Sequence, residues 1–157
     1  MLMDTRSSAL PPGRLLARGV CRHLPGHGFA CVEEFVPVRG LRVDVMALGP
    51  RGEFWVVECK SSVADFRADS KWRSYLAWCD RYFWAVGLDF PAELLPADTG
   101  LIVADGHDAE ILRMGPEARL APSRRRALLQ RFARHAAGRL QALRDPGVSR
   151  FSSRPFP

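Results

Sequence analysis

The stretch LRVDVMALGPRGEFWVVECK, residues 41–60, decides how the centre of this chain folds. It contains two apolar runs, residues 41–48 and 54–60, on either side of the segment Gly49-Pro50-Arg51-Gly52. Apolar runs of this length, bounded by glycine and proline, are typical of β-strands joined by a tight turn. We therefore predict an antiparallel hairpin over these residues.

Because successive side chains of a strand point to opposite faces, the polar residues of the hairpin can be assigned to one of its two faces. Glu58 and Lys60 share one face, which we expect to be exposed, and the hairpin places Asp44 on that face if Leu48 pairs with Phe54. Asp44 then lies opposite Glu58. The other face, which we expect to be core, takes Trp55, Val57 and Cys59.

Two directly opposed carboxylates indicate a cation site. Opposed residues have Cβ atoms about 4.5–5.5 Å apart, and carboxylates that close repel unless one is protonated or a cation lies between them. Mg²⁺ and Mn²⁺ prefer oxygen ligands, and a metal-bound water of lowered pKa can attack a phosphodiester. Asp44 and Glu58 are therefore candidate metal ligands, provided that a one-residue slip does not move Glu58 to the other face.

Lys60 is the third candidate catalytic residue. Of the 23 basic residues 21 are arginine, and the two lysines are Lys60 and Lys71. An ammonium group is a compact charge whose pKa can shift, unlike a guanidinium, and it can orient water or stabilise charge on a phosphate. The alternative is a chance lysine in an ordinary ion pair with Glu58 or Asp44. We favour the functional interpretation.

The elements around the hairpin predict an α/β fold. We expect a first helix and a first strand before the hairpin, and the three consecutive strands form an antiparallel meander because their connections are short. The order α-β-β-β-α-β, with a further hairpin and a C-terminal helix, gives an α/β sandwich with a mixed sheet. The expected ranges are a helix over 7–24, a strand over 29–38, a turn over 63–67, a helix over 70–78, strands over 82–86, 101–104 and 110–113, and a helix over about 122–144.

Length and composition agree with one domain over residues 1–157. No run of about 18 apolar residues exists, and residues 1–10 lack the pattern of a signal peptide, so we expect a cytoplasmic protein. None of the four cysteines belongs to a CxxC pair or to a Cys/His cluster with zinc spacing. We expect reduced and mostly buried thiols, and we assign no role to the four histidines.

The positive charge is concentrated near the C-terminus. Residues 113–154 hold eleven arginines and two acids, which gives +9, whereas the whole chain carries +6, so the remainder carries −3. A basic end beside an acidic centre suits a protein that binds DNA phosphates with one part and a metal with another. An arginine-rich solvated helix face explains the charge equally well. The candidate DNA contacts are Arg124, Arg125, Arg126 and Arg131.

Asp44 followed by Glu58-Cys59-Lys60 resembles the (P)D…(D/E)xK pattern of the PD-(D/E)XK nuclease superfamily. A wider set of residues, spread over about 14–145, looks like the MmcB family of bacterial DNA-repair proteins. This resemblance implies a restriction-endonuclease-like fold, a role in repairing damaged DNA, Asp44 and Glu58 as metal ligands, and Lys60 as the catalytic lysine. The wider set comprises residues 42–48, 57–62, Asp65, Phe66, Asp69, Lys71, Trp72, Tyr75, Cys79, Asp80, Tyr82, Phe83, residues 100–105 and residues 124–126.

Two departures from the superfamily pattern concern the acids. Residues 5–24 contain no acid for the first helix, so Glu33 or Glu34 is the candidate third acid, and Val43 rather than proline precedes Asp44. Around the motif we expect Trp72 to pack in the core and Lys71 to serve the site, and Ser61 and Ser62 are candidate helix caps. The expected supporting residues are Ser61, Asp65, Asp69, Lys71 and Tyr75.

Three functions follow, in order of preference. The first is a DNA-repair endonuclease that uses Mg²⁺ or Mn²⁺ to hydrolyse phosphodiester bonds. The second is a DNA-binding repair module on a nuclease fold without cleavage, because fold does not guarantee chemistry. The third is an interaction protein with a structural carboxylate network. The sequence leaves the oligomeric state open, a homodimer included.

Overall fold

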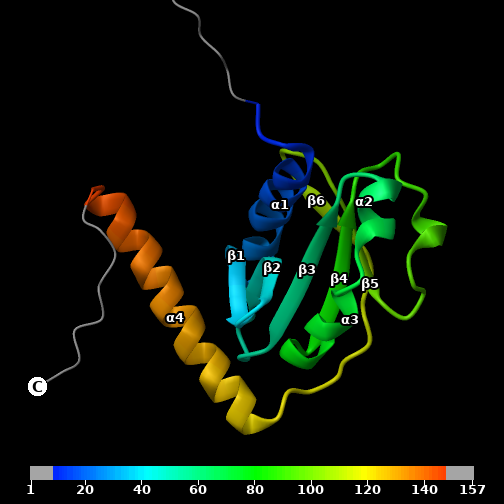
Figure 1. The fold of residues 1–157 in the computed structure, drawn as a ribbon. Helices are drawn as coiled ribbons and strands as arrows, with labels where there is room; N and C mark the ends of the chain where they lie inside the picture. Colours follow the sequence, from blue (N-terminus) through cyan, green and yellow to red (C-terminus); the bar gives the residue numbers. More distant parts are fainter. Residues whose placement is uncertain (1–8, 148–157) are drawn as a thin grey trace, which may run out of the picture.

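The computed structural model describes residues 9–147, which form one six-stranded sheet flanked by helices (Figure 1). The strands lie in the order β1-β2-β3-β4-β5-β6. The first three pair antiparallel, β3, β4 and β5 are parallel, and β6 returns antiparallel to β5. The expected α/β class with a mixed sheet is confirmed. The strands are β1 Ala30–Val38, β2 Leu41–Leu48, β3 Phe54–Lys60, β4 Arg81–Val86, β5 Gly100–Ala104 and β6 Ala109–Arg113.

The helices agree with the sequence in order but differ in extent. The first helix begins at Pro12, a position where proline is tolerated because its missing N–H has no partner in a helix; residues 7 and 8 of the expected range lie outside the described residues. The expected helix over 70–78 is instead two short pieces, α3 and η2. The helical elements are α1 Pro12–His23, η1 Leu24–His27, α2 Val63–Ala68, α3 Trp72–Tyr75, η2 Leu76–Trp78, η3 Ala92–Leu94 and α4 Pro122–Arg144.

The sheet is buried on both faces. On one face α1 and the following η1 pack through Leu16, Val20 and Leu24 against a cluster that includes Val57 and Phe83. On the other face the core includes Met46, Phe54, Val56, Trp72, Trp84, Leu128 and Phe132. All seven residues of β3 are consequently buried. The expectation that Glu58 and Lys60 lie on an exposed face is wrong, because helices cover both sides of the strand that carries them.

Gly19 allows α1 to lie close to the turn between β5 and β6. A Cβ at this position would clash with the main-chain carbonyl oxygens of Asp105 and Asp108. The helix therefore rests directly on that turn. This contact sets how closely α1 approaches the sheet, and the first turn of the same helix lines the cavity described below.

The C-terminal helix α4 packs through its first half. Leu128 and Phe132 are buried and Ala136 is partly buried against the same core. The apolar side that the sequence predicts continues to Leu140 and Leu143, but these side chains are 58% and 80% exposed. The prediction is wrong for them because α4 runs away from the sheet toward its C-terminal end (Figure 1).

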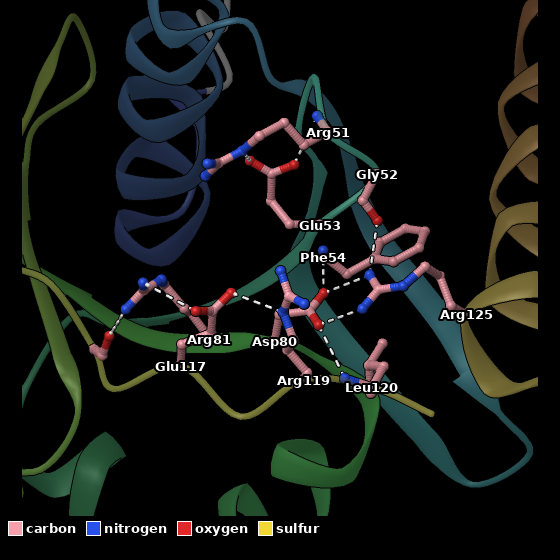
Figure 2. Close-up of polar contacts among 11 residues, drawn as sticks. Arg51, Gly52, Glu53, Phe54, Asp80, Arg81, Glu117, Arg119, Leu120 and Arg125 are labelled. Atoms are coloured by element: carbon pink, nitrogen blue, oxygen red, sulfur yellow. Dashed lines mark hydrogen bonds and ion pairs between the residues drawn. The ribbon is translucent and has the colours of Figure 1, made fainter. Parts of the chain in front are cut away.

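A buried ion pair attaches α4 to the sheet (Figure 2). Asp80, 2% exposed, lies just before β4 and receives two bonds from Arg125, Nη1 to Oδ2 at 2.8 Å and Nη2 to Oδ1 at 2.6 Å. The main-chain N–H groups of Phe54 and Leu120 donate to the same carboxylate. Although burial opposes ionisation, these bonds lower the pKa of Asp80. Four donors thus compensate the cost of burying one charge.

Replacing Arg125 by alanine should lower the free energy of unfolding by about 3 kcal/mol, because it leaves the Asp80 carboxylate buried without its ionic partner. Urea denaturation at pH 7 measures this loss. The difference from the unmodified protein should narrow as the pH falls below about 4, where a carboxyl of lowered pKa becomes protonated. The control is Arg126→Ala at the neighbouring exposed position, and an equal loss in both variants would contradict the proposed attachment.

Candidate functional site

The register of β2 on β3 is the one that the hairpin predicts. Leu48 pairs with Phe54, and the pairing continues to Val45 and Val57. Beyond that point the side chains of the two acids bond to the opposite main chain. The Asp44 N–H donates to Glu58 Oε1 at 2.9 Å, and the Cys59 N–H donates to Asp44 Oδ2 at 2.8 Å. Each carboxylate is thus held by the strand it faces through one of its two oxygens.

These two carboxylates line a cavity of about 510 Å³. The first turn of α1, the strands β1, β2 and β3, and the segment from α2 to α3 surround it. Six acidic and four basic side chains line it, so it suits a ligand that carries both a metal and negative charge. Its charged lining residues are Glu33, Glu34, Asp44, Glu58, Asp65, Asp69, Arg14, Arg42, Lys60 and Lys71.

Burial and mutual repulsion keep Glu58 from ionising easily. Glu58 is 4% exposed, and burial together with the charge of Asp44 raises its pKa to about 8. Burial also raises the pKa of Asp44, although the Cys59 N–H and the charge of Lys60 act in the opposite direction. The pair therefore gains from any cation that neutralises it.

Lys60 lies beside the pair and is held by a different carboxylate. Its Nζ is 2.8 Å from Asp69 Oδ2 and 4.0 Å from Asp65 Oδ1, and 5.9 Å from the centre of the Trp84 ring. Burial disfavours the ammonium, but the bond to Asp69 and the neighbouring carboxylates raise the pKa of Lys60 above its ordinary value. The ion pair that the sequence offers, with Glu58 or Asp44, is replaced by one with Asp69.

The segment after β3 is built to present Asp65 and Asp69. Ser62 caps α2, because its Oγ accepts the N–H of Asp65, while Asp65 Oδ2 accepts the N–H of Ser61. Asp69 Oδ1 accepts the N–H groups of Lys71 and Trp72 and so starts α3 there. The helix expected over 70–78 begins only at Trp72, with Lys71 at the position before it. The other carboxylate oxygen of Asp69 accepts from Lys60, and these bonds lower the pKa of Asp69.

The remaining expected supporting residues divide between site and core. Lys71 is exposed and lines the cavity, and Tyr75 donates its hydroxyl proton to the main-chain oxygen of Arg42 at 3.1 Å. Burial and the charge of Glu58 raise the pKa of Tyr75 to about 12. Trp72 packs against Trp84 in the core, as expected. Asp80, which the sequence groups with them, lies instead in the attachment of α4.

Glu33 and Glu34, the two candidates for a third acid, both line the cavity, and the choice between them stays a prediction. Across residues 9–147 no three His, Cys, Asp or Glu side chains gather as a group that could hold a metal ion. Glu34 has a φ of 51°, in the left-handed region, which side chains other than glycine adopt at a cost. Strain of this kind occurs at functional sites more often than elsewhere.

Two arginines of the cavity were not found by sequence reasoning. Arg42 is two residues before Asp44 on the same strand, so strand alternation could have indicated it. Arg14 comes from the first turn of α1, and no local pattern links it to the motif.

Three of the four candidate DNA-binding arginines also bond to other parts of the chain, outside α4. Arg124 donates to the oxygen of Ala77 and its guanidinium lies 4.6 Å from the centre of the Trp78 ring. Arg131 donates to the oxygen of Pro37 at 2.6 Å. Arg125 is bound to Asp80, and Arg126 is exposed. Contact with DNA stays a prediction for these residues.

The fold and the site define a class: an α/β protein with a mixed sheet and a buried carboxylate–lysine cluster where two central strands separate. The model of the DNA repair protein MmcB-like family matches residues 2–147, and the chain belongs to that family. A solved structure of a protein of unknown function from Silicibacter pomeroyi is 70% identical, with a TM-score of 0.88. The match covers 90% of this chain and 98% of that one.

No curated protein matches the chain. None of the helices within residues 9–147 is long and apolar enough to cross a membrane. The four cysteines are free thiols, with Cys59 and Cys79 buried and the other two partly buried.

Replacing Glu58 by glutamine should stabilise the metal-free protein at high pH. The pKa of Glu58 is about 8 in the folded protein and about 4.3 in the unfolded chain. The folded state is therefore destabilised as the pH rises between these two values, because the unfolded chain ionises first. The free energy of unfolding should therefore rise by ~2 kcal/mol or more at pH 9 and change little near pH 4.5. Denaturation at both pH values with EDTA measures this, and exposed Glu110→Gln is the control. A gain that is equal at both pH values would refute the shift.

Proposed function

We propose that this protein is a metal-dependent nuclease that hydrolyses DNA phosphodiester bonds during repair. The observation that carries the proposal is the pair Asp44 and Glu58, each held by the main chain of the opposite strand in a cavity that also contains Lys60. The α-β-β-β-α-β order is compatible with a PD-(D/E)XK nuclease-like fold. Membership of the MmcB-like DNA repair family supports DNA as the substrate.

The residues present fit Mg²⁺ or Mn²⁺. Such ions keep several waters and are commonly held by one or two carboxylates together with substrate phosphate. Asp44 and Glu58 each use one oxygen on a main-chain N–H, so the second oxygen of each could serve a cation, and their mutual repulsion favours one. A bound ion would supply a water of lowered pKa as the nucleophile. Glu33 or Glu34 remains the candidate third acid, since both line the cavity.

Lys60 and the cavity arginines would orient the DNA phosphate. The ammonium of Lys60 is kept charged by Asp69 and lies on the same wall as the carboxylates. Fixed positive groups in a partly buried site stabilise the negative charge that grows on the phosphate during attack. Arg14 and Arg42 add positive charge at the cavity rim.

A second candidate is a DNA-binding repair module without cleavage. One observation favours it: within the described residues no third acid completes a metal-holding group with Asp44 and Glu58. A nuclease fold that has lost part of its ligand set can retain DNA binding.

Helix α4 would contribute the main phosphate-binding surface. Residues 122–144 contain seven arginines and no acid. Arg126 is exposed, and Arg124 and Arg131 use only part of their donors on the protein, since a guanidinium carries five N–H groups. We assign Arg125 to the attachment of α4 rather than to DNA, because its donors go to Asp80 and Gly52.

The nuclease proposal is tested by incubating the protein with single-stranded, duplex and branched DNA in Mn²⁺ or EDTA. Cutting should require the metal and fall by about 100-fold or more in Lys60→Ala, because a charge-stabilising group is lost. Arg51→Ala, an exposed cation at the far end of the β2–β3 hairpin, should cut normally. DNA binding without cutting would favour the module, and cutting that survives both EDTA and Lys60→Ala would exclude the proposed site.

The role of α4 is tested through the salt dependence of DNA binding. Each phosphate contact that is removed should lower the slope of log K against log salt by about 1. We expect this for Arg126→Ala and for Arg131→Ala, with weaker binding to every DNA sequence. Arg51→Ala is again the control. An unchanged slope in both α4 variants would place the phosphate-binding surface elsewhere.

A further inference from the structure

A second hollow adjoins the cavity at the carboxyl ends of two parallel strands. Its volume is about 280 Å³, and it lies between the turn after β3 and the loop after β4. In open α/β sheets the carboxyl ends of the strands are where ligands commonly bind. We call this hollow the loop groove. Its lining residues are Ser61, Ser62, Val63, Gly87, Leu88, Asp89, Phe90 and Pro91.

The loop groove differs chemically from the cavity. Among the described residues that line it, Asp89 carries the only charge, and the rest are apolar or hydroxyl-bearing. A phosphate would meet no cation there and would be repelled by Asp89. An uncharged, flat, partly polar ligand meets apolar contacts and hydroxyl groups that both donate and accept hydrogen bonds. A nucleobase has this chemistry.

Phe90 gives the loop groove a fixed aromatic side chain. Its ring is partly buried and meets the ring of Phe66 at 6.4 Å, and Phe66 in turn meets Trp84 edge-on at 5.3 Å. Trp84 is also the ring beside the ammonium of Lys60. A ring that is braced in this way loses little freedom when a base stacks on it.

The loop groove lies close enough to the candidate catalytic residues to take the nucleotide next to a phosphate in the cavity. Ser61 of the loop groove directly follows Lys60 of the cavity, and consecutive Cα atoms are about 3.8 Å apart. A phosphate in the cavity would therefore place an adjacent base near the loop groove. At its rim stands Leu88, 86% exposed. Apolar side chains in such a position can enter a base step and unstack it.

We propose that the loop groove binds an unpaired nucleobase next to the phosphate in the cavity, with Phe90 stacking on the base and Leu88 holding the helix open. The inference rests on the proposed function, since it takes the cavity as the phosphate site. It defines the substrate as DNA that carries an unstacked or unpaired nucleotide, rather than intact duplex. A paired base cannot reach the groove, because it remains in the helix stack.

The test measures binding in EDTA, so that no cleavage occurs. The probes are a short duplex with one bulged 2-aminopurine and the same duplex with that base paired. The bulged probe should bind about tenfold more tightly, because stacking of one base on an aromatic ring contributes a free energy of that size. The fluorescence of its 2-aminopurine should also fall on binding, since stacking quenches it. Phe90→Leu keeps an apolar side chain against Phe66 and should remove the preference. Leu88→Ser should weaken it, whereas Leu143→Ser, equally exposed on α4, should not.

Equal affinity of the unmodified protein for both probes would overturn the proposal, and so would an unchanged preference in Phe90→Leu. Thermal denaturation of each variant shows whether it is folded, and Leu88→Ser, an exposed position, tests the groove independently of the core. Failure of the proposed function is distinguishable: a protein that never cuts DNA in Mn²⁺ but prefers the bulged probe retains the base site without the nuclease.

Discussion

The pairing of Leu48 with Phe54 is the constraint on which the site depends. It sets the register of β2 on β3, and that register brings Asp44 to Glu58. Because the side-chain period of a strand is two, a slip of one residue would turn Glu58 to the α1 side of the sheet. The regular pairing stops at Val45 and Val57, and beyond it carboxylates replace main-chain oxygens as acceptors. The main-chain N–H groups of Asp44 and Cys59 therefore stay paired beside the cavity, where the regular pairing ends.

Burial of the sheet on both faces determines the electrostatics that follow. Charged groups on β3 can remain only when they are compensated, since uncompensated burial is costly. Lys60 is compensated by Asp69, whereas the Asp44 and Glu58 carboxylates face each other, and burial together with the charge of Asp44 raises the pKa of Glu58. At the opposite end of the strands, Asp80 is compensated by Arg125. The Lys60–Asp69 pair belongs to the candidate site, and the Arg125–Asp80 pair fixes the position of the basic helix α4.

The positions of α4 and the cavity suggest a continuous path for a DNA strand. The guanidinium of Arg139 lies 3.5 Å from the carbonyl oxygen of Glu34, the strained residue of β1 that lines the cavity. The basic helix therefore passes the cavity at β1, and the loop groove lies at the other side, beyond Lys60. Phosphate binding, metal binding and base recognition would occupy neighbouring surfaces along one strand.

The sequence by itself determined the strands, their register and the start of α4. Glycine and proline bound the β2–β3 turn within five residues, and a turn that short leaves few alternative registers. Pro122 marks the beginning of the last helix in the same local way. The pattern of Asp44, Glu58 and Lys60 was therefore readable, since it depends on contacts within one hairpin.

Only the tertiary structure decided how these residues are surrounded. Glu58 and Lys60 are buried because the α2–α3 segment and, further along the same face, α4 pack over that side of the sheet. The alternation of side chains along a strand shows which residues share a face, but it does not show what covers that face. Local patterns also do not link Asp80 to Arg125, 45 residues apart, or Arg14 to the cavity. Such contacts arise when separate elements pack together, and packing depends on the whole chain rather than on neighbouring residues.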